Sequence, residues 1–237
     1  MQIVHVERRA TLPIMGNILT MNAEHPKNSL DLLRLGAAIM VLYSHQYALL
    51  GLAEPTLLGR NSFGGAGVAI FFFLSGFLVS ASWERDPDIV RFFTRRSLRI
   101  FPGLWFVFVL SFFLLGPLLT TLPLDDYFSS TTTWRYLGTA ALVSSNVLPG
   151  VFADNPMPLV INGSLWSLPV EFLCYGTVAA LGLMPRVITM NRDVSLGVAL
   201  VGVMVAATYG PPIIGVSLWP HLEMVAMFWW GCSTVIV

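Results

Sequence analysis

The feature that most constrains this chain is a series of apolar runs, each about as long as a bilayer is thick. A helix needs about 20 apolar residues to cross the hydrocarbon core. Such runs occupy residues 30–52, 66–83, 100–122 and 165–184. Only 11% of the 237 residues are charged, against about 25% in soluble domains. Because so few polar side chains cannot cover a water-facing surface, the sequence predicts an all-α, polytopic transmembrane helix bundle.

The number of crossings depends on three further segments. Residues 194–209 form a shorter candidate span, and the apolar run 223–237 reaches the last residue. With these two, the sequence predicts about six spans, the last one incomplete. Residues 134–148 are ambiguous, because they fit a short span, a re-entrant segment or an interfacial segment. Residues 1–29 lack the apolar core and cleavage site of a secretory signal and are predicted to be a cytoplasmic tail.

Basic residues predict the orientation, because Lys and Arg accumulate in cytoplasmic loops. With the N-terminus inside and 134–148 not crossing, eleven Lys and Arg face the cytoplasm, and only Arg60 and Arg135 face outward. If 134–148 crosses, the split is nine against four. The formal net charge is zero, which gives no reason to expect a nucleic-acid partner. The two cysteines are too few for a disulfide framework, and no metal-binding cluster is recognisable.

The first apolar run carries ionisable residues on one side of a helix. Arg34 and His45 are eleven residues apart, close to three turns, so both side chains point in almost the same direction. Asp31, three residues before Arg34, shares that face. The axial separation of Arg34 and His45 is roughly 16 Å. The arginine is therefore predicted to lie near the cytoplasm, and the imidazole to be buried deep in the outer half of the membrane. Three interpretations remain open. The two residues line a cavity, or Arg34 is a snorkelling anchor at the membrane border, or His45 makes a hydrogen bond in helix packing.

Three arginines, Arg95, Arg96 and Arg99, stand where a cytoplasmic loop enters the run 100–122. Spacings of three and four residues place Arg99 on a shared helix face with each of the others. A topological anchor needs only loosely placed basic residues. The exclusive use of arginine also fits phosphate binding, because guanidinium forks bind phosphate oxygens bidentately. Both interpretations remain open on this feature alone.

A carboxylate, Glu171, falls near the start of the run 165–184, at a predicted depth similar to that of His45. Ser167 and Tyr175 lie four residues to either side and share its helix face. Trp166 suits the membrane interface. We therefore expect Glu171 and His45 to face one cavity, the alternative being a protonated carboxyl within the bundle. Ser75 lies in a run of phenylalanines, and its role is either helix packing or part of a cavity wall.

These segments together resemble the acyltransferase 3 family of integral-membrane enzymes, which O-acylate bacterial surface polysaccharides. The resemblance rests on LDLLRLGAAIMVLYSH, VAIFFFLSGF, FFTRRSLRIFP and NGSLWSLPVEFLCYG, in that order, from about Leu30 to Tyr175. It identifies 30–237 as a partial acyltransferase domain. Family members usually continue through several more spans, so the chain is expected to be truncated at its C-terminus.

The resemblance implies transfer of an acyl group, most often acetyl, from acyl-CoA to a carbohydrate hydroxyl at the bacterial inner membrane. His45 corresponds to the family's essential histidine and Arg34 to its paired arginine. The donor-binding arginines correspond to Arg95, Arg96 and Arg99. No cofactor is expected to be bound permanently, and acyl-CoA is a co-substrate.

In the mechanism we expect, His45 acts as a general base and Glu171 orients it or holds the sugar. An acyl-histidine intermediate remains an alternative. The competing functions are a membrane transporter or flippase component, whose buried charges would line a pathway, and an inactive fragment. The acceptor sugar and the oligomeric state do not follow from the sequence.

Overall fold

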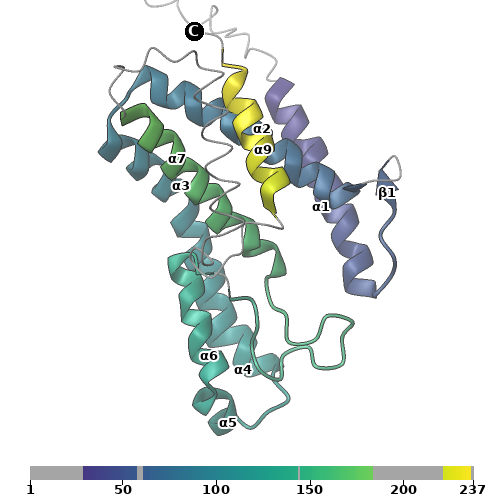
Figure 1. The fold of residues 1–237 in the computed structure, drawn as a ribbon. Coiled ribbons are helices and arrows are strands. Elements are labelled where there is room, and N and C mark those ends of the chain that lie inside the picture. The colour runs from purple at the N-terminus through teal and green to yellow at the C-terminus, as the bar shows by residue number, and fades with distance from the viewer. Residues whose placement is uncertain (1–28, 58–60, 144, 184–220, 236–237) are drawn as a thin grey trace, which may run out of the picture.

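The computed structural model describes residues 29–57, 61–143, 145–183 and 221–235, and most of them are helical (Figure 1). The predicted tail, except for Ser29, and the candidate span 194–209 lie outside the described residues. A two-stranded antiparallel sheet, β1 (Thr56–Leu57) with β2 (Asn61–Ser62), joins the first two helices.

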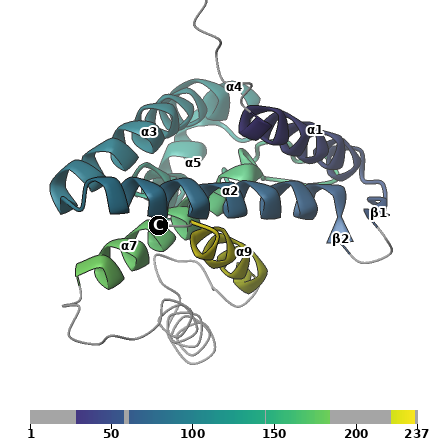
Figure 2. The ribbon, with the colours of Figure 1, turned by 90° about the horizontal axis from the view of Figure 1, so that it is seen from above.

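The helix α2 (Phe63–Arg85) is the centre of the bundle. It packs against α1 (Ser29–Leu50) and α9 (Leu222–Ser233). Seen from above, α1 and α3 (Ile89–Val109) lie on one side of α2, and α7 (Ser167–Leu183) and α9 lie on the other (Figure 2). The crossing with α9 depends on Gly76, where a side chain would collide with the backbone of Phe228. Close backbone approach of this kind is typical of helix pairs in membranes.

A long helical stretch follows α2. The helix α3 (Ile89–Val109) continues through the π-helical η1 (Leu110–Leu115) into α4 (Gly116–Leu119). Asp88 caps its beginning by accepting a hydrogen bond from the Arg91 amide at 2.8 Å. The helix therefore begins eleven residues before the predicted span 100–122, because the arginine-rich segment is the first part of the helix and not a loop.

The segment after α4 folds into a small lobe beside η1. It contains α5 (Leu124–Ser129), α6 (Thr131–Arg135) and the 3-10 helix η2 (Tyr136–Ala141). A separate apolar cluster holds it, with Tyr127, Tyr136 and Phe112 almost fully buried. The described residues of the ambiguous segment 134–148 form no helix long enough to cross a bilayer, which supports the non-crossing alternative.

The helix α7 (Ser167–Leu183) follows the short 3-10 helix η3 (Gly163–Trp166) and matches the predicted span 165–184. By length and composition, three described stretches are apolar enough to cross a membrane: Phe63–Arg85, Ile89–Leu119 and Gly163–Leu183. The helix α1 has 22 residues, which is long enough to cross a membrane, but α1 is not among these three apolar stretches. The prediction of an all-α membrane protein is confirmed, whereas the total of about six spans stays a prediction.

Candidate active site

Four of the ionisable residues selected from the sequence meet at a cavity of about 290 Å³ between α1, α2, α3 and the beginning of α7. Its polar lining comprises Arg34, His45, Ser75, Arg99, Ser164, Trp166, Ser167 and Glu171. The remainder is apolar and includes Phe72 and Leu74 of α2. We call this the first cavity. His45 and Glu171, which are 126 residues apart in the chain, therefore face one space.

Glu171 is held at the wall of the first cavity by two hydroxyl groups. Ser75 donates a hydrogen bond to its Oε1 at 2.9 Å, and Tyr175 donates to the same oxygen. Tyr175 is fully buried, and its hydroxyl lies 3.5 Å from that of Ser75. Because both donors use Oε1, the second carboxylate oxygen is left for a group in the cavity. Ser75 is thus a wall residue that binds Glu171, and not only a packing residue.

The three arginines of α3 do not act as one cluster. Arg99 lines the first cavity. Arg95 instead forms an ion pair with Asp86 at 3.0 Å, and Arg91 pairs with the same carboxylate at 2.9 Å. Of the three, only Arg99 lines the first cavity, and the carboxylate of Asp86 in the turn before α3 pairs with Arg95, so a donor site with all three guanidiniums stays a prediction.

Arg96 points into the bundle. Its side chain is only 9% exposed, and its guanidinium carbon lies 5.7 Å from the ring centroid of Phe92 and 5.5 Å from that of Tyr175. Such cation–π contacts stabilise a desolvated guanidinium. Arg96 therefore supports the Glu171–Tyr175 pair from behind and does not line the first cavity.

On α1, the predicted stripe of ionisable groups is present. Arg34 lines the first cavity and is held by Asp31 at 2.9 Å. His45 lines it as well, and its side chain is exposed among the described residues, while its depth in the membrane stays a prediction. The side chain is exposed because α1 packs mainly on α2, so His45 faces open space beyond that contact.

Glu54, which the sequence analysis missed, fastens the end of α1 to the beginning of α2. It accepts hydrogen bonds from the Ser44 hydroxyl and from the Gly64 amide, the latter at 3.1 Å. Burial raises the pKa of the Glu54 carboxyl, but these hydrogen bonds and the nearby His45 outweigh it and hold the pKa below its ordinary value. A carboxylate ten residues after a serine carries no local signal of such a contact.

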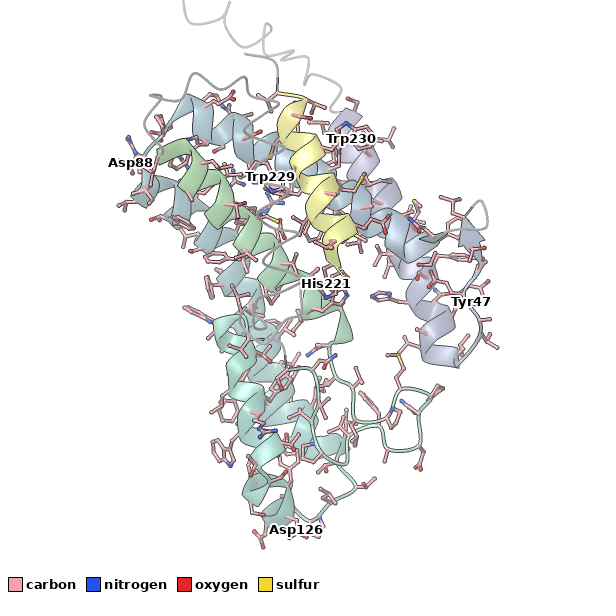
Figure 3. The ribbon with its side chains drawn as sticks, viewed as in Figure 1. Tyr47, Asp88, Asp126, His221, Trp229 and Trp230 are labelled. Carbon is pink, nitrogen blue, oxygen red and sulfur yellow. The ribbon has the colours of Figure 1, made fainter. Side chains whose placement is uncertain are left out.

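His221, also missed, lies at the beginning of α9, near the start of α7 (Figure 3). Its ring stacks on Trp166, with centroids 4.4 Å apart and planes inclined by 19°. This contact holds the Trp166 indole, which lines the first cavity. Burial lowers the pKa of His221, which favours a neutral ring for stacking.

The fold and the cavity define a class: a helical membrane protein with a charged cavity enclosed by its helices. The family described as an acyltransferase domain matches residues 27–236, so the chain belongs to that family. The resemblance seen in the sequence is thereby confirmed.

Two curated relatives match about two thirds of the chain. An "O-acetyl transferase" of Shigella phage Sf6 is 41% identical over 151 residues, which are 64% of this chain and 44% of the relative. "Nodulation protein 10" of Rhizobium leguminosarum bv. viciae is 37% identical over 169 residues, 65% of this chain and 44% of the relative. The chain thus spans less than half the length of either relative. No solved structure matches it.

Proposed function

We propose that the protein transfers an acetyl group from acetyl-CoA to a hydroxyl group of a cell-surface or exported carbohydrate. The observation that carries this proposal is the first cavity, where an imidazole, a carboxylate and two guanidiniums of an acyltransferase-family chain meet. The name of the phage relative, an O-acetyl transferase, supports acetyl as the group and oxygen as its acceptor.

In the proposed reaction His45 is the general base. The imidazole takes the proton of the acceptor hydroxyl while that oxygen attacks the thioester carbonyl carbon. The new C–O bond forms as the C–S bond breaks, and the proton passes from His45 to the sulfur of CoA. The products are an O-acetyl sugar and free CoA. General base catalysis by a positioned side chain contributes about 10²–10⁴-fold.

Glu171 has the positioning role in this proposal. Ser75 and Tyr175 hold Oε1, which leaves the other oxygen for a group in the first cavity that Glu171 lines. There it accepts a hydrogen bond from His45 or from the sugar and stabilises the imidazolium that forms during the reaction. A fixed carboxylate beside a general base acts in this way in other acyl-transfer sites.

The donor is proposed to enter from the arginine side of the first cavity. Arg34 and Arg99 line it and offer guanidinium forks to the phosphates of CoA. The extended arm of CoA then runs along α1 to His45, a rise of roughly 16 Å. In this proposal the N-terminus is cytoplasmic, where acetyl-CoA is made, and the protein lies in the bacterial inner membrane.

The test uses membranes that contain the protein, supplied with radiolabelled acetyl-CoA. We expect label in the carbohydrate fraction, and loss of O-acetyl groups from the surface glycan of a deletion strain. A transporter or flippase component would instead reduce the amount of exported glycan without changing its acetylation. Absence of acetyl-CoA-dependent labelling, together with an unchanged acetyl content in the deletion strain, would overturn the proposal.

A further inference from the structure

A second cavity, of about 530 Å³, lies on the other side of His45 from the arginines. It is formed by the end of α1 and the loop that precedes α7, and its lining includes Asn146, Phe152, Asn155 and Asn162. Its volume falls within the range of about 300–1,000 Å³ that is usual for small-molecule sites. The two cavities share His45, Ser164 and Trp166.

The chemistry of this second cavity differs from that of the first. Apart from His45, none of its lining residues is ionisable. Among the described residues, the side-chain amides of Asn146 and Asn155 make no hydrogen bond, so both can bind a ligand. The amide nitrogen of Asn162 is occupied, because it donates to Ser111 at 2.5 Å and to Tyr136 at 3.1 Å.

Two aromatic rings line the second cavity in addition to the polar groups. Phe152 and Trp166 line the second cavity, and Trp166 is held in place by the His221 ring stacked on it. An amide offers both donors and an acceptor to hydroxyl groups. An aromatic face offers a flat apolar surface to the C–H side of a sugar ring. Neutral amides beside two aromatic rings therefore suit an uncharged carbohydrate and give nothing to bind the phosphates of CoA.

We propose that the second cavity binds the acceptor, a neutral carbohydrate that is either free or linked to a lipid, so that donor and acceptor reach His45 from opposite sides. This inference rests on the proposed function and deepens it by assigning the acceptor site. Asn146 and Asn155 bind sugar hydroxyls, Phe152 and Trp166 contact the ring, and His45 takes the proton from the hydroxyl that points toward the first cavity.

The test compares three variants of the exposed loop, each in the full chain. Asn155→Ala removes one amide, Asn155→Trp fills the second cavity, and Asp154→Ala is the matched control, because Asp154 is adjacent but does not line the cavity. The acceptor is unacetylated surface polysaccharide purified from the deletion strain. Transfer is measured with radiolabelled acetyl-CoA, and donor binding as the Kd for CoA by calorimetry.

We expect Asn155→Ala to raise the acceptor KM about two- to tenfold, the loss of one neutral hydrogen bond. Asn155→Trp should reduce transfer more than about tenfold, while the Kd for CoA stays within about twofold in both variants. Asp154→Ala should match the wild type. Label in the organic-solvent extract of whole membranes would identify a lipid-linked acceptor, and label confined to the aqueous phase a free glycan.

Normal transfer by Asn155→Trp, or a parallel loss of CoA binding, would overturn the acceptor site while leaving the proposed function intact. A wild-type protein that binds CoA but transfers no acetyl group would overturn both proposals. Membrane abundance of each variant, measured by immunoblot, excludes loss of the protein as the cause of any decrease.

Discussion

The two cavities that meet at His45 are built in different ways. The first lies among helices and contains guanidinium and carboxylate groups, whereas the second is formed largely by a loop and contains neutral amides. Asp88, which caps the beginning of α3, and Asp126, in the small lobe, lie at opposite ends of the molecule (Figure 3). In the proposed reaction, one imidazole therefore serves a charged donor and an uncharged acceptor, and each substrate has its own site.

The loop of the second cavity also carries the backbone strain of the molecule. Among the described residues, positive φ outside glycine occurs at Leu142, which ends η2, and at Phe152, Leu159 and Asn162 in this loop. For bulky residues such as Phe152 this conformation costs free energy and persists only where the surroundings impose it. In the helices that line the first cavity, no described residue other than glycine has a positive φ. Strain of this kind often accompanies ligand-binding loops.

The largest expected effect tests the residue that both cavities share. His45→Ala should reduce acetyl transfer by about 10²–10⁴-fold, the contribution of a general base, while CoA binding and membrane abundance persist. Gln46→Ala is the matched control, since this exposed neighbour lines neither cavity. Radiolabelled transfer assays in membranes measure both. Transfer by His45→Ala at the wild-type rate would remove the imidazole from the mechanism.

A smaller effect is expected at the carboxylate of the first cavity. Glu171→Gln keeps an oxygen that accepts from Ser75 and Tyr175 but removes the charge that stabilises an imidazolium. Because a charge-assisted hydrogen bond becomes a neutral one, kcat should fall about tenfold, with the acceptor KM unchanged. Steady-state kinetics separate the two constants. A rise in the acceptor KM at constant kcat would instead place Glu171 on the sugar.

The arginines of α3 should differ from one another. Arg99→Lys replaces a fork with a point charge and should raise the KM for acetyl-CoA about fivefold, the loss of one hydrogen bond. Arg95→Lys is the matched control, because Arg95 pairs with Asp86 and does not line the first cavity. An unchanged KM for acetyl-CoA in both variants would argue that the arginine segment acts only as a membrane anchor, because lysine keeps the charge.

The smallest effect is expected at Glu54, which fastens α1 next to His45. Glu54→Gln should lower the stability of the detergent-solubilised protein by about 1 kcal/mol at pH 7, since solvent at this half-buried position weakens its charged hydrogen bonds. The pKa of Glu54 is lowered in the folded protein, so this contribution is present above the ordinary carboxyl pKa of about 4.3 and disappears as the pH falls through the lowered value.

Thermal unfolding of both proteins across the pH range measures this contribution. The Tm difference between wild type and Glu54→Gln should be constant near neutral pH and vanish in acid. A difference that grows on acidification would mean that Glu54 is destabilising in its charged form.

Several parts of the site could be predicted from local spacing. The interval from Arg34 to His45 and the interval from Ser167 to Glu171 each place two side chains on one helix face, and all four residues line the first cavity. Helical periodicity is a property of the backbone itself, so it survives whatever the helix packs against. Periodicity does not say what a side chain contacts. Arg95 pairs with Asp86, in the turn before α3.

By itself, then, the amino-acid sequence determined the membrane environment, the main helices and the faces on which the charged residues stand, since these follow from hydropathy and from the repeat of the helix. Only the tertiary structure decided which arginine reaches the cavity, that Ser75 binds Glu171 from another helix, and that a loop encloses a second cavity beside His45. Those contacts join residues roughly a hundred positions apart, and they depend on how helices cross and where loops return, which no local pattern encodes.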